Sequence, residues 1–124
     1  MKKKYDISIV YRIYPGVSKD PIIHSDNKLE LSKVAIKSFR NSFGSLNPKI
    51  WILLDNCTDE YKEIFKTNLE GYQFEFIDLA GVGGYETFKM QVNILLNQSE
   101  SDFIYFAEDD YVFLPNALEN SLKF

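Results

Sequence analysis

The chain has 124 residues, 45% of them hydrophobic, which fits one folded domain rather than a disordered segment. Its formal net charge of -4 gives no basic surface for nucleic acid, so we expect no nucleic-acid partner. No apolar run approaches the roughly 20 residues of a membrane span. Cys57 is the only cysteine, which excludes an intrachain disulfide. Together with the lack of a visible secretory signal, this predicts a cytoplasmic location.

The one basic cluster of the sequence is Lys2-Lys3-Lys4. One interpretation is a solvated terminal segment that keeps the chain soluble. The other is a weak attraction to an anionic membrane surface, so peripheral membrane contact stays open as a partner hypothesis.

The first predicted elements are a strand and a loop. The β-branched segment Ile7–Ile13 ends just before Pro15-Gly16, which predicts a strand followed by a turn. Residues 16–26 predict a loop, and we expect the single histidine, His24, to be exposed in it. One histidine without neighbouring ligands indicates no metal cluster.

A helix is predicted next from one apolar face. Leu31, Ala35 and Phe39 recur every four residues, and Phe43 continues the row. Gly44 follows the last apolar residue, at the place where a left-handed helix cap is expected.

Residues 50–54 are all apolar, as expected of a strand that is covered on both faces. Asp55 stands at its end, and Thr58 followed by two acidic residues is typical of the start of a helix. Gly71 ends this helix, and its predicted apolar stripe is Tyr61, Ile64, Phe65 and Leu69.

Residues 73–77 partly alternate and predict a third strand, which a glycine-rich turn at 81–84 follows. Residues 102–107 predict a fourth strand, and Pro115 suits the first turn of a last helix. Between the third and fourth strands, helical spacing predicts another helix with the apolar residues Tyr85, Phe88, Val92 and Leu95.

These elements alternate as β-α-β-α-β-α-β-α. Such alternation predicts an α/β fold with an open, mainly parallel sheet, right-handed crossovers and helices on both faces. No repeat or linker divides the chain, so we expect residues 1–124 to form a single domain. Sheets of this kind bind ligands beyond the carboxyl ends of their strands. Polar residues follow three predicted strands there, at Arg12, Asp55 and 108–110.

The acidic triplet Glu108-Asp109-Asp110 is the most informative of these groups. Three neighbouring carboxylates repel one another, and a hard divalent cation relieves the repulsion. Residues i and i+2 of an extended segment point to the same side, so Glu108 and Asp110 are expected to face one Mn²⁺ or Mg²⁺ ion. The alternative is a solvated acidic turn that caps the following helix.

The segment 105–111, followed by Leu114-Pro115-Asn116-Ala117-Leu118, resembles the acidic metal motif of glycosyltransferases with the GT-A fold, and those of family 2 most. The strands at Ile7–Ile13 and 50–54, the second ending in Asp55-Asn56-Cys57-Thr58-Asp59, resemble the family's first two strands. The segment 83–89 resembles its nucleotide-contacting helix. The resemblance covers nearly the whole chain but only the first half of the family's catalytic module. Glu108 departs from the family's more usual Asp.

This resemblance implies the sugar-nucleotide-binding half of a glycosyltransferase, as in polysaccharide biosynthesis, with a UDP-sugar as the expected donor and an unknown acceptor. The implied metal ligands are Asp110, directly, and Glu108, directly or through water. The implied donor contacts are Asp109 to the ribose or sugar, Asp55 to the base, and Arg12 and Lys89 to the diphosphate. The alternatives are a helix-entry cap for Asp55 and a solvated side chain for Arg12 and Lys89.

An inverting enzyme of this family also needs a carboxylate base for the acceptor hydroxyl, and the resemblance places that base in the acceptor-binding half, beyond Phe124. We therefore expect the isolated chain to bind the donor but to transfer sugar poorly or not at all. Two other hypotheses are a receiver domain and a non-catalytic interaction domain whose acids only cap a helix. The receiver hypothesis is weaker because Tyr11-Arg12 follows the first strand, where a receiver has its acidic pair.

Overall fold

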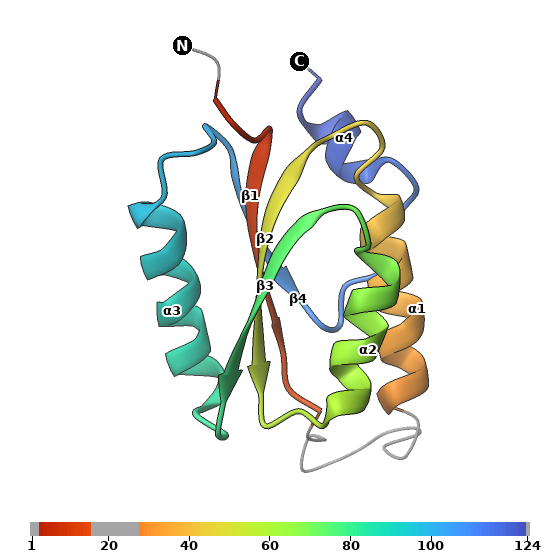
Figure 1. Cartoon of the computed structure of the whole chain (residues 1–124), viewed down its shortest axis with the longest axis vertical. Helices are drawn as coiled ribbons and strands as arrows, with labels where there is room; N and C mark the ends of the chain where they lie inside the picture. The colour runs from red at the N-terminus through yellow and green to blue at the C-terminus, as the bar shows by residue number, and fades with distance from the viewer. Residues whose placement is uncertain (1–2, 16–27, 124) are drawn as a thin grey trace.

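The computed structural model describes residues 3–15 and 28–123 and confirms the predicted α/β fold. The predicted loop at 16–26, with His24, lies outside the described residues. In chain order the elements are β1 (Ile7–Ile13), α1 (Lys28–Asn41), β2 (Pro48–Asp55), α2 (Asp59–Asn68), β3 (Gln73–Leu79), α3 (Gly83–Asn97), β4 (Ile104–Glu108) and α4 (Ala117–Ser121). Figure 1 shows α1, α2 and α4 on one face of the sheet and α3 on the other. None of the described helices is long and apolar enough to cross a membrane.

The four strands form one parallel sheet in the order β3-β2-β1-β4. The chain adds β2 and then β3 on one side of β1, and then crosses back to place β4 on the other side. The register sets Ile13 beside Leu54 of β2 and Arg12 beside Glu108 of β4. The strand order therefore reverses at β1. In doubly wound sheets, the crevice beyond the carboxyl ends of the strands at such a reversal is where ligands bind.

The face covered by α1, α2 and α4 holds a large aromatic core. The ring of Tyr11 lies 4.9 Å from that of Phe39 and 5.2 Å from that of Phe65, measured between centroids. Phe39 also packs edge-on against Phe43 at 4.8 Å, and all four side chains are fully buried. Aromatic pairs in this geometry add to the stabilisation that burial alone provides.

The face covered by α3 holds a smaller cluster built from Val10, Leu53 and Leu95. Thr87 and Gln91 are also buried on this helix, so its contact with the sheet is partly polar. The predicted apolar face of α3 was wrong in its first half, because Tyr85 and Phe88 are exposed.

The predicted face of α1 needs a similar correction. Leu31 is exposed, and the buried residues are Ser32, Ala35, Ile36 and Phe39. Four residues turn an α-helix slightly more than once, so a row at this spacing drifts by about 40° per step. Leu31 is two positions away from Phe39 in this row, so its side chain has turned from the buried face of the helix toward solvent.

Other boundaries shift by a few residues. The fourth strand begins at Ile104 instead of 102, and Gly83 and Gly84 belong to the first turn of α3 rather than to the preceding turn. Pro115 precedes α4, whose N-cap Asn116 has a φ of 61°. The predicted left-handed conformation of Gly44 is confirmed, with a φ of 55°.

Candidate functional site

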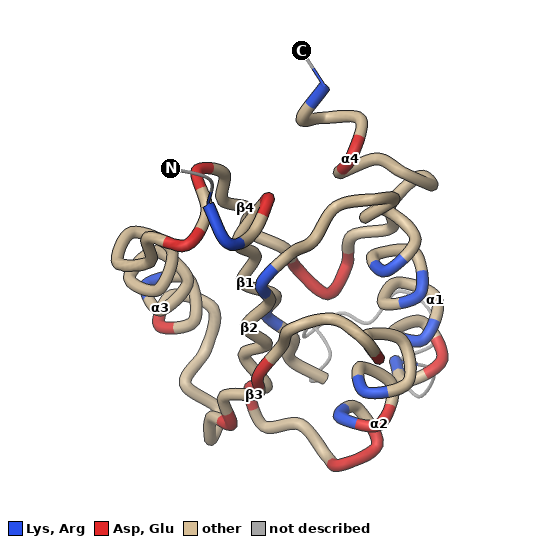
Figure 2. Tube along the Cα trace, turned by 45° about the horizontal axis from the view of Figure 1, so that its top comes forward, with Lys and Arg blue, Asp and Glu red and all other residues tan. Residues whose placement is uncertain are grey.

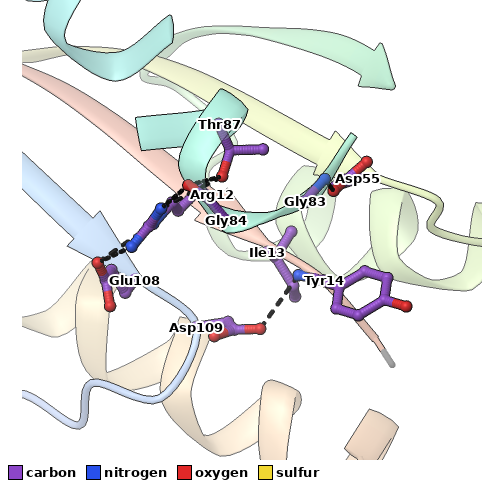
Figure 3. A pocket seen from close by; sticks show the side chains of 9 residues that line it. All are labelled: Arg12, Ile13, Tyr14, Asp55, Gly83, Gly84, Thr87, Glu108 and Asp109. Carbon is purple, nitrogen blue, oxygen red and sulfur yellow. Dashed lines mark hydrogen bonds and ion pairs between the residues drawn. The ribbon is translucent and has the colours of Figure 1, made fainter. Parts of the chain in front are cut away.

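A cleft of about 160 Å³ opens at the carboxyl ends of β1, β2 and β4, beside the first turn of α3 (Figure 3). Four of the six predicted site residues line it: Arg12, Asp55, Glu108 and Asp109. The remaining lining residues are Ile13, Tyr14, Gly83, Gly84 and Thr87. The other two predicted residues, Lys89 and Asp110, do not line the cleft.

Asp55 organises the loop between β3 and α3. Its side chain ends β2 and is only 1% exposed. Oδ1 accepts hydrogen bonds from the backbone N–H groups of Gly81 and Val82 at 2.7 and 2.9 Å, and Oδ2 accepts one from Gly83 at 2.9 Å. Asp55 therefore holds the loop that leads into α3, whose N-cap residue is Val82. Its contact with a nucleoside base stays a prediction.

Arg12 connects three elements around the cleft (Figure 3). Its Nε and Nη2 both donate to Oε1 of Glu108, the Nε bond measuring 3.1 Å. Its Nη1 donates to the backbone oxygen of Gly84 at 2.7 Å and to Oγ1 of Thr87 at 3.2 Å. The guanidinium thus lies at the edge of the cleft, between the end of β4 and the start of α3.

Asp109 forms the second ion pair of the site. Its Oδ2 accepts hydrogen bonds from Nζ of Lys28 at 2.9 Å and from the backbone N–H of Tyr14 at 3.1 Å. Sequence reasoning missed Lys28. A signal did exist, because a lysine in the first turn of a helix opposes the helix dipole and calls for an acidic partner elsewhere.

The acidic triplet is not extended. β4 ends at Glu108. The backbone N–H of Tyr111 donates a hydrogen bond to the backbone oxygen of Glu108 at 3.1 Å, which closes a turn. The expectation that Glu108 and Asp110 share one side of a strand was therefore wrong, because the alternation of a strand stops where the chain turns. Asp110 is exposed beside this turn.

The donor atoms fit a divalent metal in kind, although they do not form a preassembled site. Among residues 3–15 and 28–123, no three His, Cys, Asp or Glu side chains converge on one point. Mn²⁺ or Mg²⁺ takes one or two carboxylates and completes its shell with phosphate oxygens and water. Glu108 and Asp109 are such carboxylates beside a cleft, and each is engaged by a basic side chain. The metal ligands therefore stay a prediction.

Gln91 is a second residue that sequence reasoning missed. It is fully buried on α3, and its Nε2 donates to the backbone oxygens of Val10 at 2.9 Å and of Ala107 at 3.2 Å. It thereby joins β1 to β4 just before the strands deliver Arg12 and Glu108. The spacing of four residues from Thr87 to Gln91 to Leu95 marks a buried row that the search for apolar residues passed over.

Burial affects two more groups near the acids. It raises the pKa of Tyr11, whose hydroxyl is further kept protonated by the charges of Asp109 and Asp110. That hydroxyl has no hydrogen-bond partner among the described residues. Burial, with Asp109 and Asp55 nearby, also raises the pKa of the Cys57 thiol to about 12, so this thiol is not a nucleophile at neutral pH.

The remaining basic candidates lie away from the cleft lining. Lys89 pairs loosely with Glu86 on the surface of α3, at 3.9 Å, so its contact with a diphosphate stays a prediction. Lys3 and Lys4 lie within 3.7 Å of Asp102 and 3.6 Å of Glu100, and Lys2 is outside the described residues. Figure 2 shows basic and acidic residues of the described trace interspersed. Membrane contact therefore also stays a prediction.

No protein-family model matches the chain, and a search of curated proteins finds no match for its sequence. The functional interpretation therefore depends on the geometry of the cleft and on the residues that form it.

Proposed function

We propose that the chain is the sugar-nucleotide-binding part of a glycosyltransferase and that the donor diphosphate binds in the cleft. One observation carries this proposal. Arg12, Asp55 and the pair Glu108-Asp109 are far apart in the sequence, yet all line one cleft where the strand order reverses. Nucleotides bind at this place in doubly wound sheets, whose common order 3-2-1-4-5-6 has the same first four strands as this sheet.

The strand order also weighs against the receiver hypothesis. Flavodoxin-like sheets, the group to which receiver domains belong, have the order 2-1-3-4-5, in which β1 lies between β2 and β3. Here β1 lies between β2 and β4, and Arg12 stands at its carboxyl end.

The interaction-domain hypothesis, in which the acids only cap a helix, has less support than the binding hypothesis. The carboxylates of Glu108 and Asp109 contact Arg12 and Lys28, and the N-cap of the following helix is Asn116. Acidic side chains that pair with basic side chains around a cleft are better suited to binding a charged ligand than to capping a helix.

The cleft matches the reacting end of the donor. Its volume of about 160 Å³ is below the roughly 300–1,000 Å³ of pockets that enclose whole ligands. The cleft therefore suits the diphosphate of the donor, while the rest of the donor lies outside it. A Cβ placed on Gly83 or Gly84 would meet no atom within 4 Å, so the start of α3 has room for a phosphate, although the N–H of Gly83 already donates to Asp55.

Arg12, with its planar set of donors, is the residue in the lining best suited to phosphate oxygens. Glu108 and Asp110 are the predicted ligands of Mn²⁺ or Mg²⁺, and Asp109, which lines the cleft beside Glu108, is a further carboxylate next to them. When bound, such an ion supplies Lewis-acid stabilisation of the charge that develops on the departing nucleoside diphosphate. No residue of the cleft lining is assigned as the base for the acceptor hydroxyl, so the donor-binding step is the one to test.

Calorimetric titration of the chain with UDP and UDP-sugars, with and without Mn²⁺, tests the proposal. We expect binding that Mn²⁺ strengthens and that Asp110→Asn weakens about tenfold in the presence of Mn²⁺. Glu63→Gln is the matched control, because it removes one exposed negative charge from α2, outside the cleft. Covalent modification by acetyl phosphate would instead favour a receiver. No binding of any of these nucleotides would refute the proposal.

A further inference from the structure

Two ion pairs border the cleft on either side of one short turn. Glu108 at the end of β4 contacts Arg12 of β1, and the adjacent Asp109 contacts Lys28 at the start of α1. Arg12 of the cleft lining and Lys28 next to that lining are thus held by the lining acids Glu108 and Asp109. Figure 3 shows the first of these pairs at the edge of the cleft, with Asp109 close by.

We propose that these two ion pairs act as a charge latch that couples metal binding to diphosphate binding. When Glu108 and Asp109 take a divalent cation, Arg12 and Lys28 are released from them and bind the diphosphate. Lys28 is thereby assigned as a further phosphate-binding residue. The inference rests on the proposed function, because it requires a nucleoside diphosphate in this cleft.

The charge of the cluster explains why the two ligands need each other. Four acids, Asp55 and the three at 108–110, lie at the cleft or in the adjoining turn and outnumber Arg12 and Lys28 by two, so the cluster repels a diphosphate when it carries no metal. A divalent cation cancels this excess negative charge. Both cationic side chains then gain more from phosphate oxygens than from carboxylates that already bind a metal.

Both ion pairs of the latch can be reached by a ligand. The side chains of Arg12 and Glu108 are 23% and 30% exposed, and those of Lys28 and Asp109 are 24% and 21% exposed. An incoming cation or phosphate can therefore compete for each partner, while partial burial keeps the charges weakly screened by salt. The hydrogen bonds of Arg12 to Gly84 and Thr87 keep the guanidinium at the cleft after Glu108 lets go.

The experiment measures UDP affinity of the full chain by calorimetry, with Mn²⁺ or with a chelator. For the wild type we expect Mn²⁺ to tighten UDP binding by about tenfold or more. Glu108→Gln frees Arg12, so we expect this variant to bind UDP about threefold to tenfold more tightly in the chelator. We also expect Mn²⁺ to lose most of its effect on the UDP affinity of this variant. The gain would show that Glu108 opposes UDP binding when no metal is present, and the next variant separates the loss of its ion pair from simple relief of repulsion.

The double variant Arg12→Met/Glu108→Gln decides whether the gain comes from Arg12. Compared with Arg12→Met alone, the double variant should show no gain if the latch is right, whereas relief of repulsion alone would preserve the gain. Glu63→Gln serves again as the charge-matched control and should leave metal-free UDP binding unchanged. Thermal melts of each variant check that the fold is retained, and Gln and Met at these partly exposed positions are expected to preserve it.

Lys28→Met gives an independent test with two readouts. It should weaken UDP binding in Mn²⁺ about tenfold, and it should also strengthen binding of Mn²⁺ alone, because Asp109 loses its competing partner. The latch is refuted if Glu108→Gln brings no gain, if the gain survives in the double variant, or if Lys28→Met weakens Mn²⁺ binding. If the wild type binds UDP but the variants show none of these effects, the latch is refuted and the proposed function is not. Absence of UDP binding by the wild type under both conditions would refute the proposed function as well.

Discussion

The two faces of the sheet differ in what covers them and in what they hold in place. Three helices cover one face over a core of aromatic rings in tilted and edge-to-face contact, whereas α3 alone covers the other with a small apolar cluster and buried polar groups. Every charged side chain that lines the cleft, apart from Asp109 in the turn, comes from the strand positions on the α3 side. The aromatic face therefore supports the fold, while the α3 face positions the candidate site.

Successive residues of a strand point to opposite faces, which is how the same strands serve both purposes. On the α3 side of each strand that borders the cleft, an apolar residue is followed two positions later by a charged one. These pairs are Val10 and Arg12, Leu53 and Asp55, and Phe106 and Glu108.

The largest effect is expected on the aromatic face. Phe39 is fully buried against Tyr11, Phe43 and Phe113. Phe39→Ala removes the central ring and leaves a cavity, so we expect the free energy of unfolding to fall by about 3–5 kcal/mol. Urea denaturation followed by circular dichroism measures this loss.

A smaller loss of stability is expected on the α3 face. Leu95→Ala should lower the free energy of unfolding by about 2–3 kcal/mol, because the surrounding cluster is small. It should also weaken UDP binding, since α3 provides the contacts of Arg12 with Gly84 and Thr87. If Leu95→Ala costs more stability than Phe39→Ala in the same urea series, the proposed division between the two faces is wrong.

The sequence predicted the fold well because its signals are local and repeated. Residues 50–54 are continuously apolar, and the structure confirms a strand there that is covered on both faces. The alternation of strands and helices was sufficient to predict a parallel sheet. Helix faces were less predictable, because a row such as Leu31, Ala35 and Phe39 drifts around the helix, and only the neighbouring elements determine where burial stops.

The site was predictable only in part. Arg12, Asp55 and Glu108 were found because strand ends in a parallel sheet converge. The contacts of Asp55 with the 81–83 loop and the pairing of Lys28 with Asp109 join positions that are 26 or more residues apart, and no periodicity reports such contacts. The turn after Glu108 depends on backbone geometry that an acidic triplet alone does not specify.

Asp55→Asn is expected to lower the free energy of unfolding by an intermediate amount, and it tests whether the α3 face of the sheet positions the candidate site. An amide in place of the carboxylate leaves at least one backbone N–H group of the 81–83 loop without its acceptor, which should cost about 1–2 kcal/mol of unfolding free energy. UDP affinity should fall as well, because this loop leads into the first turn of α3. Asp102→Asn, at an exposed position away from the cleft, should change stability by less than about 0.5 kcal/mol. Equal effects of the two variants on chemical denaturation would show that Asp55 does not organise the loop.

The smallest effect is expected for Tyr11→Phe, which removes the one polar atom of the central aromatic side chain. Its hydroxyl is buried without a hydrogen-bond partner among the described residues, so the variant should be as stable as the wild type or up to about 1 kcal/mol more stable at pH 7.

The pH dependence of stability gives Tyr11→Phe a second readout. Burial raises the pKa of Tyr11 in the folded state above its ordinary value of 10.0. The contribution of the protonated Tyr11 hydroxyl to stability is therefore complete below pH 10. It is lost as the pH rises further, because only the unfolded chain then releases the proton. The variant lacks this loss, so its advantage over the wild type should grow by up to about 1.4 kcal/mol per pH unit above pH 10. Urea denaturation of both proteins between pH 7 and 11 measures the difference. A constant difference would mean that the hydroxyl ionises as freely in the folded protein as in the unfolded chain, and that the aromatic face is open to water at the end nearest the acids.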